Sequence, residues 1–128
     1  MKLTKNFTLS EFASHDGAPF PPDVLTNLQE IAKNLQALRD YLGCPLKINS
    51  GYRSPAHNKA VGGASKSQHV LGKAADISCH KYTPAQVHAA IQHLIKTGKM
   101  QDGGLGQYNT FTHYDIGTPR RWDLRTSL

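Results

Sequence analysis

Two short stretches of this 128-residue chain carry the side chains that could do chemistry. In "SKSQHVLGKAADI", His69 and Asp76 are separated by small residues and by Gly72, whose backbone freedom allows a tight turn. In "THYDI", the alternation of a strand places His113 and Asp115 on the same face. Two imidazoles and one carboxylate that leave a fourth position open form the ligand set of a catalytic zinc site. The spacing therefore predicts that His69, Asp76 and His113 converge on a metal ion.

Spacing alone leaves a second interpretation open, in which His69 and Asp76 form a buried hydrogen-bonded pair without a metal. The other five histidines do not combine into such a set, although His15 lies beside Asp16 in a loop. His88 and His93, for example, are five positions apart in a helical segment and so do not share a helix face. For these five we expect solvated or hydrogen-bonded imidazoles.

The elements that must position these residues are helices and short strands in alternation. From Asp23 to Leu42, apolar residues recur every three or four positions, which predicts an amphipathic helix that Gly43 ends. Two further helices are predicted at "PAHNKAV" and "PAQVHAAIQHLIK", each with a Ser or Thr N-cap before its proline. The segments "LKINS", "AADIS", "GLGQY" and "THYDI" are typical of short strands. This order predicts a small α+β domain.

Length and composition limit the class of protein. A chain of 128 residues forms one domain with its own core, so we expect a single domain over residues 1–128. No apolar run is long enough to span a membrane, and no apolar segment follows the N-terminal lysines, so neither stable membrane insertion nor an ordinary signal peptide is expected. Cys44 and Cys79 do not have a metal-binding spacing, and we expect two buried thiols, with a disulfide as the alternative if the protein ends outside the cytoplasm.

The net charge of +6 and the pI near 9.5 favour an anionic partner. The lysines and arginines are scattered, with no basic helix, zinc-finger spacing or aromatic binding motif, which is evidence against a nucleic-acid-binding protein. A membrane surface and an anionic cell-wall polymer remain as partner classes. For the C-terminal "PRRWDLRTSL" we expect packing through Trp122, with solvated arginines, and binding of wall polymer is the alternative.

The motif around His69 resembles a known family. "SQHVLGKAADI" follows the pattern S-x-H-x-x-G-x-A-x-D, with Ser67, Gly72 and Ala74 at its small positions, and is similar to the first metal motif of the zinc D-Ala-D-Ala carboxypeptidases. That group also holds lysostaphin-type peptidases and the hedgehog signalling domain. "INSGYRSPAHNKAVGGA" and "GGLGQYNTFTHYDIG" resemble the segments that precede the motif and close the site, and the resemblance covers nearly the whole chain.

The resemblance implies a fold, a cofactor and a substrate. It implies helices packed on a short antiparallel sheet that carries one Zn²⁺ per chain, with His69, Asp76 and His113 as ligands. It also implies peptidoglycan stem peptides as substrate. Arg53 resembles the family arginine near the substrate carboxylate, and we expect it to act in catalysis and in substrate binding, with Ser67 as a second substrate-binding residue.

One position departs from the family pattern. Many relatives carry Glu or His two to three residues before the last zinc ligand, whereas positions 110–112 here are Thr, Phe and Thr. Asp115, the nearest acid on the strand face of His113, is therefore expected to be the general base. The alternative is that Asp115 accepts the ring N–H of a ligand histidine and orients it.

These features predict a zinc-dependent, endolysin-type endopeptidase that cleaves the L-Ala–D-Glu bond of stem peptides. The alternatives are a D,D-carboxypeptidase or D,D-endopeptidase acting at D-Ala, and a wall-binding domain that holds zinc without catalysis. We expect a monomer that is made in the cytoplasm. It would reach the periplasm or cell wall by holin-type release or phage delivery.

Overall fold

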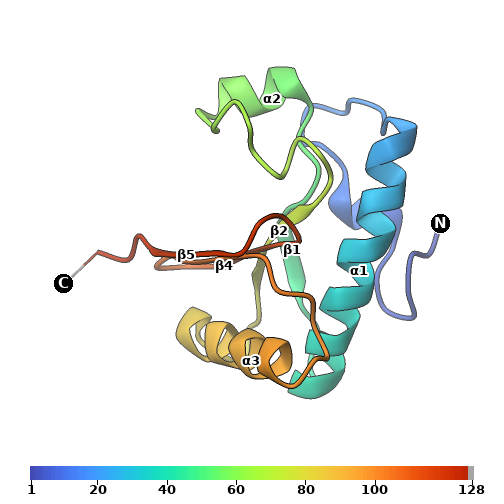
Figure 1. The fold of residues 1–128 in the computed structure, drawn as a ribbon. Helices are drawn as coiled ribbons and strands as arrows, with labels where there is room; N and C mark the ends of the chain where they lie inside the picture. Colours follow the sequence, from blue (N-terminus) through green and yellow to red (C-terminus); the bar gives the residue numbers. More distant parts are fainter. Residues whose placement is uncertain (127–128) are drawn as a thin grey trace.

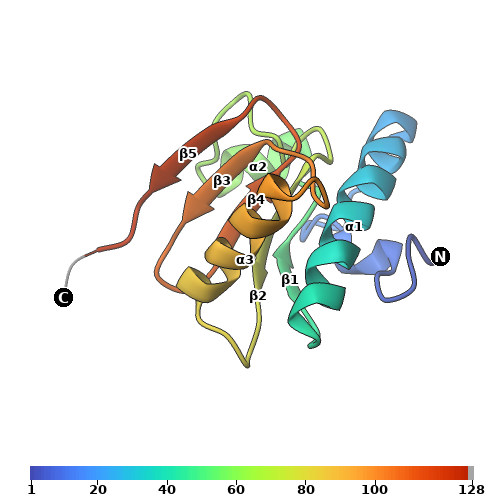
Figure 2. The ribbon, with the colours of Figure 1, turned by 60° about the horizontal axis from the view of Figure 1, so that its bottom comes forward.

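The computed structural model describes residues 1–126 of the chain, and positions 127 and 128 of the predicted domain lie outside the described residues. Figure 1 shows a sheet with α3 and α2 on opposite sides of it and α1 running past its β1 edge, and Figure 2 shows the same arrangement from another direction. In chain order the elements are η1 (Leu9–Phe12), α1 (Pro22–Leu42), β1 (Lys47–Ser50), α2 (Pro55–Ala60), β2 (Ala74–Ser78), α3 (Pro84–Lys96), β3 (Gly104–Gln107), β4 (Thr112–Asp115) and β5 (Arg120–Asp123).

The helices begin and end where their capping residues predict. Gly43 follows α1 with φ of 68°, the left-handed conformation that glycine adopts at little cost, and its N–H donates to the carbonyl of Arg39. The Ser54 side chain caps α2 by accepting from the backbone N–H of His57. Thr83 and Gln86 form a reciprocal capping box at the start of α3. The three predicted helices are thus confirmed.

The sheet has five strands in the order β1-β2-β4-β3-β5. The pairs β1–β2, β2–β4 and β4–β3 are antiparallel, as predicted, but β3 and β5 are parallel. The prediction of an α+β domain whose antiparallel strands carry the site is confirmed, and β5 makes the sheet mixed because it pairs in parallel with β3. This strand comes from the segment that was predicted only to pack through Trp122, and it extends the sheet beyond β3.

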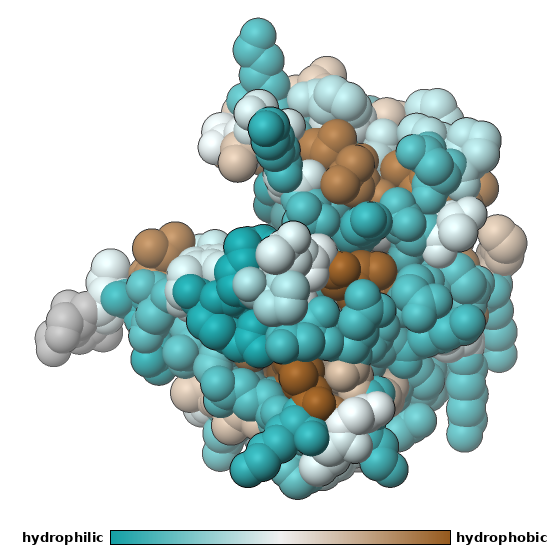
Figure 3. All heavy atoms as spheres, in the orientation of Figure 1, coloured by the Kyte–Doolittle hydropathy of each residue, from teal (hydrophilic) through white to brown (hydrophobic). Residues whose placement is uncertain are grey.

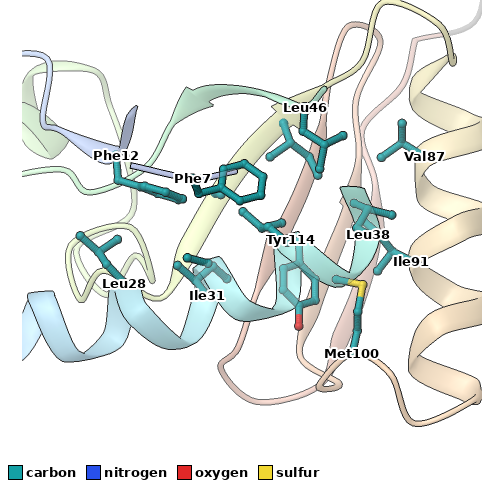
Figure 4. Close-up of a cluster of buried hydrophobic side chains, with 14 of the residues drawn as sticks. Phe7, Phe12, Leu28, Ile31, Leu38, Leu46, Val87, Ile91, Met100 and Tyr114 are labelled. Carbon is teal, nitrogen blue, oxygen red and sulfur yellow. The ribbon is translucent and has the colours of Figure 1, made fainter. Parts of the chain in front are cut away.

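The hydrophobic core fills the space between one face of the sheet, α1 and α3. Alternation along the strands sends Ile77 of β2 and Tyr114 of β4 into this core. Figure 4 shows Tyr114 beside Met100 and Leu38, with Ile91 of α3 close by. The residues next to these along each strand, such as His113 beside Tyr114, therefore point to the opposite face of the sheet. Burial of one face of each strand thus fixes which side chains meet on the other.

Two further observations concern the predictions from composition. Cys44 and Cys79 are buried and free, as expected. Among residues 1–126, no helix combines the length and the apolar character that crossing a bilayer requires.

Candidate metal centre

Asp76 and His113 are directly opposite each other on the neighbouring strands β2 and β4. The Oδ1 atom of Asp76 lies 2.9 Å from Nδ1 of His113. His69 reaches the same point from the loop between α2 and β2, with Nε2 3.3 Å from the same carboxylate oxygen. One ligand atom from each of the three buried side chains lies within 4.8 Å of the other two. The structure therefore brings together the three residues that the sequence predicted as ligands.

The backbone fixes the orientation of His69. Nδ1 of His69 lies 2.7 Å from the carbonyl oxygen of Gly51. Because a carbonyl can only accept, Nδ1 must carry the proton, and Nε2 presents a lone pair towards Asp76. The carbonyl of His69 in turn accepts from the backbone N–H of Arg53 at 3.1 Å. The loop is therefore tied to the segment after β1, and the imidazole is held ready to bind a cation.

Asp115 fixes the orientation of His113. Its Oδ2 lies 2.7 Å from Nε2 of His113. With the proton on Nε2 donated to this carboxylate, Nδ1 of the neutral ring presents its lone pair to Asp76. His69 and His113 thus bind through different ring nitrogens, and each has its other nitrogen engaged by an acceptor behind it.

This arrangement fits a metal ion on the chemistry of its donors. Two imidazole lone pairs and one carboxylate oxygen point at a common place, and without a cation between them these atoms repel one another. The set of two nitrogens and one oxygen is also one that zinc prefers, and three protein ligands leave a position for substrate or water. Among the described residues, no other three His, Cys, Asp or Glu side chains bring their ligand atoms this close together.

The pKa shifts follow from the same contacts. When no metal is bound, the histidine nitrogens that would otherwise bind it can donate hydrogen bonds to Asp76. Burial raises the pKa of Asp76, but these hydrogen bonds with His113 and His69 outweigh it and hold this pKa well below its usual range. The pKa of Asp115 is lowered in the same way, because its contacts with His113 and Arg120 outweigh the effect of burial. Burial lowers the pKa of His113, but its two carboxylate partners outweigh burial and raise it. Both carboxylates are therefore ionised at neutral pH, and the centre attracts cations.

The small residues of the first motif have separate structural reasons. Gly72 has φ of +74°, and a Cβ there would lie 2.7 Å from the side chain of Val24. Ala74 pairs directly with Asp115 across β2 and β4. A larger residue at position 74 would press on a carboxylate that is completely buried. The short side chains between His69 and Asp76 thus allow the turn to approach α1 and leave room for the acid behind His113.

Asp115 does not occupy the place expected of a general base. Its side chain is fully buried, and it contacts the ring nitrogen of His113 that faces away from Asp76. Its oxygens also accept from the backbone N–H groups of Gly104 and Gly117, each at 2.9 Å, and from the guanidinium of Arg120 at 2.7 Å. Every oxygen is thus engaged by donors, and the residue is not among those that line the cleft over the centre. This geometry is evidence against the predicted general base and favours the alternative, an orienting role.

Arg53 lies on the other side of Asp76. Its guanidinium is 3.4 Å from Oδ2 of Asp76, the oxygen that does not face the histidines. Ser50 accepts from Nε at 3.2 Å, and Asn58 accepts from Nη1 at 3.4 Å. The side chain is 19% exposed and lines the cleft, so it is held firmly yet remains within reach of a ligand.

The three candidate ligands lie in an open cleft of about 750 Å³. Arg53 and the loop after α2 form one wall, which includes Ser67, whose hydroxyl accepts from the backbone N–H of His69 at 3.2 Å. Residues from the ends of β3, β4 and β5 form the other wall. Figure 3 shows the surface hollowed between the α2 region above and these strands below. The cleft thus lies on the face of the sheet opposite the core.

Five residues of this second wall were not predicted from the sequence: Tyr108, Phe111, Thr118, Arg120 and Trp122. The available signal was the alternation in "RRWD", which places positions 120 and 122 on one face of a strand. Because this segment was interpreted as a packing tail, its part in the cleft was not expected.

Two buried histidines and one aspartate beneath an open cleft could hold a metal ion and leave a position for a substrate. Comparison with known families gives the class of protein: the family described as Peptidase M15 matches residues 3–115, and the chain belongs to this family. The chain is also similar to the zinc D-Ala-D-Ala carboxypeptidase of Streptomyces albus G, with 36% identity over 89 residues. This match covers 69% of the chain and 34% of that relative, so the chain spans about a third of the curated protein it matches.

Proposed function

We propose that this protein is a zinc-dependent peptidase that cleaves the stem peptides of peptidoglycan, with the L-Ala–D-Glu bond as its preferred target. The observation that carries the proposal is the convergence of His69, Asp76 and His113 in a cleft that also exposes Arg53. These four residues supply a metal site and, next to it, a cation for a substrate carboxylate. Stem peptides carry several free carboxylates, and a net charge of +6 suits an anionic wall polymer.

The three ligands would hold the zinc ion, which when bound supplies Lewis-acid polarisation of a peptide carbonyl and makes a water molecule more acidic. Arg53 binds a substrate carboxylate through its planar guanidinium and so sets the register of the peptide in the cleft. Gly51 and Asp115 hold the two imidazoles in the tautomers that present lone pairs to the ion. Asp115 is accordingly proposed as a positioning residue rather than as the general base.

The volume of the cleft supports an endopeptidase. Pockets for whole drug-sized ligands occupy roughly 300–1,000 Å³, and the cleft of about 750 Å³ is in this range. Cleavage of an internal bond needs peptide on both sides of the metal, and this volume leaves room for it. The two walls of the cleft differ in composition, so different residues can bind the peptide segments on the two sides of the metal.

The second candidate is a D,D-carboxypeptidase. The name of the Streptomyces albus G relative favours it, as does the closeness of Arg53 to the centre, because a carboxypeptidase must bind a terminal carboxylate beside the scissile bond. Mass analysis of digested sacculi distinguishes the two. New N-terminal D-Glu residues support the endopeptidase, whereas release of free D-Ala identifies the carboxypeptidase.

Metal removal tests the dependence on zinc. We expect one zinc per chain by elemental analysis, and we expect a chelator to remove hydrolysis of purified sacculi together with the metal. Stoichiometric zinc should restore the activity, because the protein donors are already oriented by Gly51 and Asp115. Full hydrolysis by metal-free protein would contradict the proposal. Stoichiometric zinc binding without any turnover would instead identify a wall-binding domain.

Replacing Arg53 by lysine tests the carboxylate anchor. The charge remains, but the planar fork that contacts Asp76, Ser50 and Asn58 is lost. We expect zinc content to be unchanged and kcat/KM on a stem peptide to fall by about tenfold or more, equivalent to roughly 1.4 kcal/mol. Arg125→Lys is the matched control, because Arg125 is exposed and pairs with Asp123 away from the cleft. Wild-type turnover in the Arg53 variant would show that this arginine does not bind substrate.

A further inference from the structure

Tyr108 lies just after β3 and has a fixed position in the wall of the cleft. The indole Nε1–H of Trp122 donates to its hydroxyl oxygen at 2.9 Å. The phenol ring stacks on Phe111, with ring centroids 4.4 Å apart and planes 12° from parallel. Contacts at both the ring and the hydroxyl hold this side chain in one orientation. All three aromatic residues line the cleft.

The register of the sheet explains how Trp122 connects Tyr108 with the metal centre. Gly106 of β3 is paired on one side with His113 of β4 and on the other with Trp122 of β5. A Cβ at Gly106 would collide with the indole. Because that atom is absent, the indole lies across β3, and its ring centroid is 5.0 Å from that of His113. Trp122 therefore contacts a candidate ligand with its ring and Tyr108 with its N–H.

The hydroxyl of Tyr108 is free to donate a hydrogen bond. Since the indole donates to the phenol oxygen, that oxygen serves as acceptor in this contact, and the O–H remains available as a donor. Within residues 1–126, no protein acceptor is found for it. Of the two arginines that line the cleft, Arg120 contacts Asp115, and Arg53, which contacts Asp76, is the proposed anchor for a substrate carboxylate. Tyr108 is thus a rigidly held hydrogen-bond donor whose O–H can point into the cleft.

We propose that Tyr108 is a catalytic residue whose hydroxyl donates a hydrogen bond to the carbonyl oxygen of the peptide bond being cleaved. When water adds to the carbonyl carbon, the π electron pair moves onto this oxygen, and the negative charge strengthens the hydrogen bond. The phenol keeps its proton, and the amine leaves with a proton that originates from the attacking water. Trp122 is a positioning residue, because it acts by holding the hydroxyl of Tyr108. This inference rests on the proposed peptidase function.

Tyr108→Phe removes the hydroxyl and leaves the ring to stack on Phe111. We expect kcat on a synthetic stem peptide to fall by about 100-fold, with little change in KM, because the bond strengthens only in the transition state. Zinc content should equal that of the wild type. Tyr41→Phe is the matched control, since Tyr41 is 53% exposed on α1 and lies outside the cleft. It should leave kcat unchanged.

Trp122 provides a readout that does not depend on activity, because it is the one tryptophan of the chain. Tyr108→Phe removes the acceptor of the indole N–H, so the fluorescence emission of the metal-free variant should differ from that of the wild type, whereas Tyr41→Phe should not change it. Trp122→Phe should lower kcat less than Tyr108→Phe does. The double variant should be no slower than Tyr108→Phe alone, because Trp122 acts through the hydroxyl that is already missing.

The outcomes separate the two proposals. An active wild type with an equally active Tyr108→Phe variant overturns the role of Tyr108 and leaves the peptidase function standing. Unchanged emission in Tyr108→Phe contradicts the contact on which the inference rests. A zinc-loaded wild type that fails to hydrolyse sacculi or stem peptides overturns the peptidase function and the role of Tyr108 with it.

Discussion

Replacing His113 by alanine should abolish both zinc retention and hydrolysis. His113 is 8% exposed and supplies the nitrogen that faces Asp76 across β2 and β4. Without it, two protein ligands remain, fewer than the three that a catalytic zinc site provides. We expect zinc affinity to fall by more than the roughly 100-fold that loss of an outer hydrogen-bond partner costs. Titration with zinc and analysis of digested sacculi measure both effects.

The fold of this variant needs its own check, because the change leaves a cavity and takes the imidazole away from the buried Asp115. Asp76→Asn tests the same centre without a change in volume and should lose zinc as well. His80→Ala is the matched control, since His80 is exposed and belongs to no metal-binding group among the described residues. Thermal unfolding of the metal-free proteins separates folding from metal binding. A folded His113→Ala protein with normal zinc content would show that the ligand assignment is wrong.

The sequence predicted that the three candidate ligands converge because the position of each depends on a local pattern. The glycine turn before β2 and the alternation of "THYDI" place the three side chains on the face that the core does not use. The helix caps are local too, and Gly43, Ser54 and Thr83 act where they were predicted. Patterns formed by a few neighbouring residues predicted the local structure correctly, because tertiary contacts did not override them here.

The part that could not be predicted depends on contacts between distant segments. β5 is a short, mostly exposed edge strand, so it lacks the buried alternation that identifies a strand from sequence. Its pairing with β3 in parallel is set by tertiary structure, and with it the place of Trp122 beside His113. The role of Asp115 was uncertain for a related reason. Strand alternation gives the face of a residue, but not which nitrogen of a neighbouring imidazole its carboxylate contacts.

Asp115→Asn is the second change for which we expect a large effect. The four protein groups closest to this carboxylate are all donors: two backbone N–H groups, the guanidinium of Arg120 and the ring N–H of His113. An amide of the same shape has one acceptor and one donor, so its NH₂ group must face donors in either orientation. The least costly arrangement keeps the amide oxygen on the two backbone N–H groups and turns the NH₂ group towards His113.

This arrangement changes the tautomer of His113. Facing an NH₂ group, Nε2 must become an acceptor, and the ring proton moves to Nδ1, the atom that faces Asp76. That nitrogen then has no lone pair for a metal. We therefore expect zinc affinity to fall by about 10- to 100-fold, with hydrolysis falling alongside it at limiting zinc. Isothermal titration with zinc and stem-peptide turnover across a range of zinc concentrations measure the two quantities.

The general-base hypothesis predicts a different result for the same variant, namely normal zinc affinity with nearly complete loss of turnover at any zinc concentration. Asp102→Asn is the matched control, because Asp102 also forms a 2.7 Å ion pair with an arginine, Arg121, but at the surface and without a histidine. It should change neither quantity. A variant of Asp115 that binds zinc and cleaves stem peptides like the wild type would exclude both roles. Reduced zinc affinity would instead identify Asp115 as the residue that selects the metal-binding tautomer of His113.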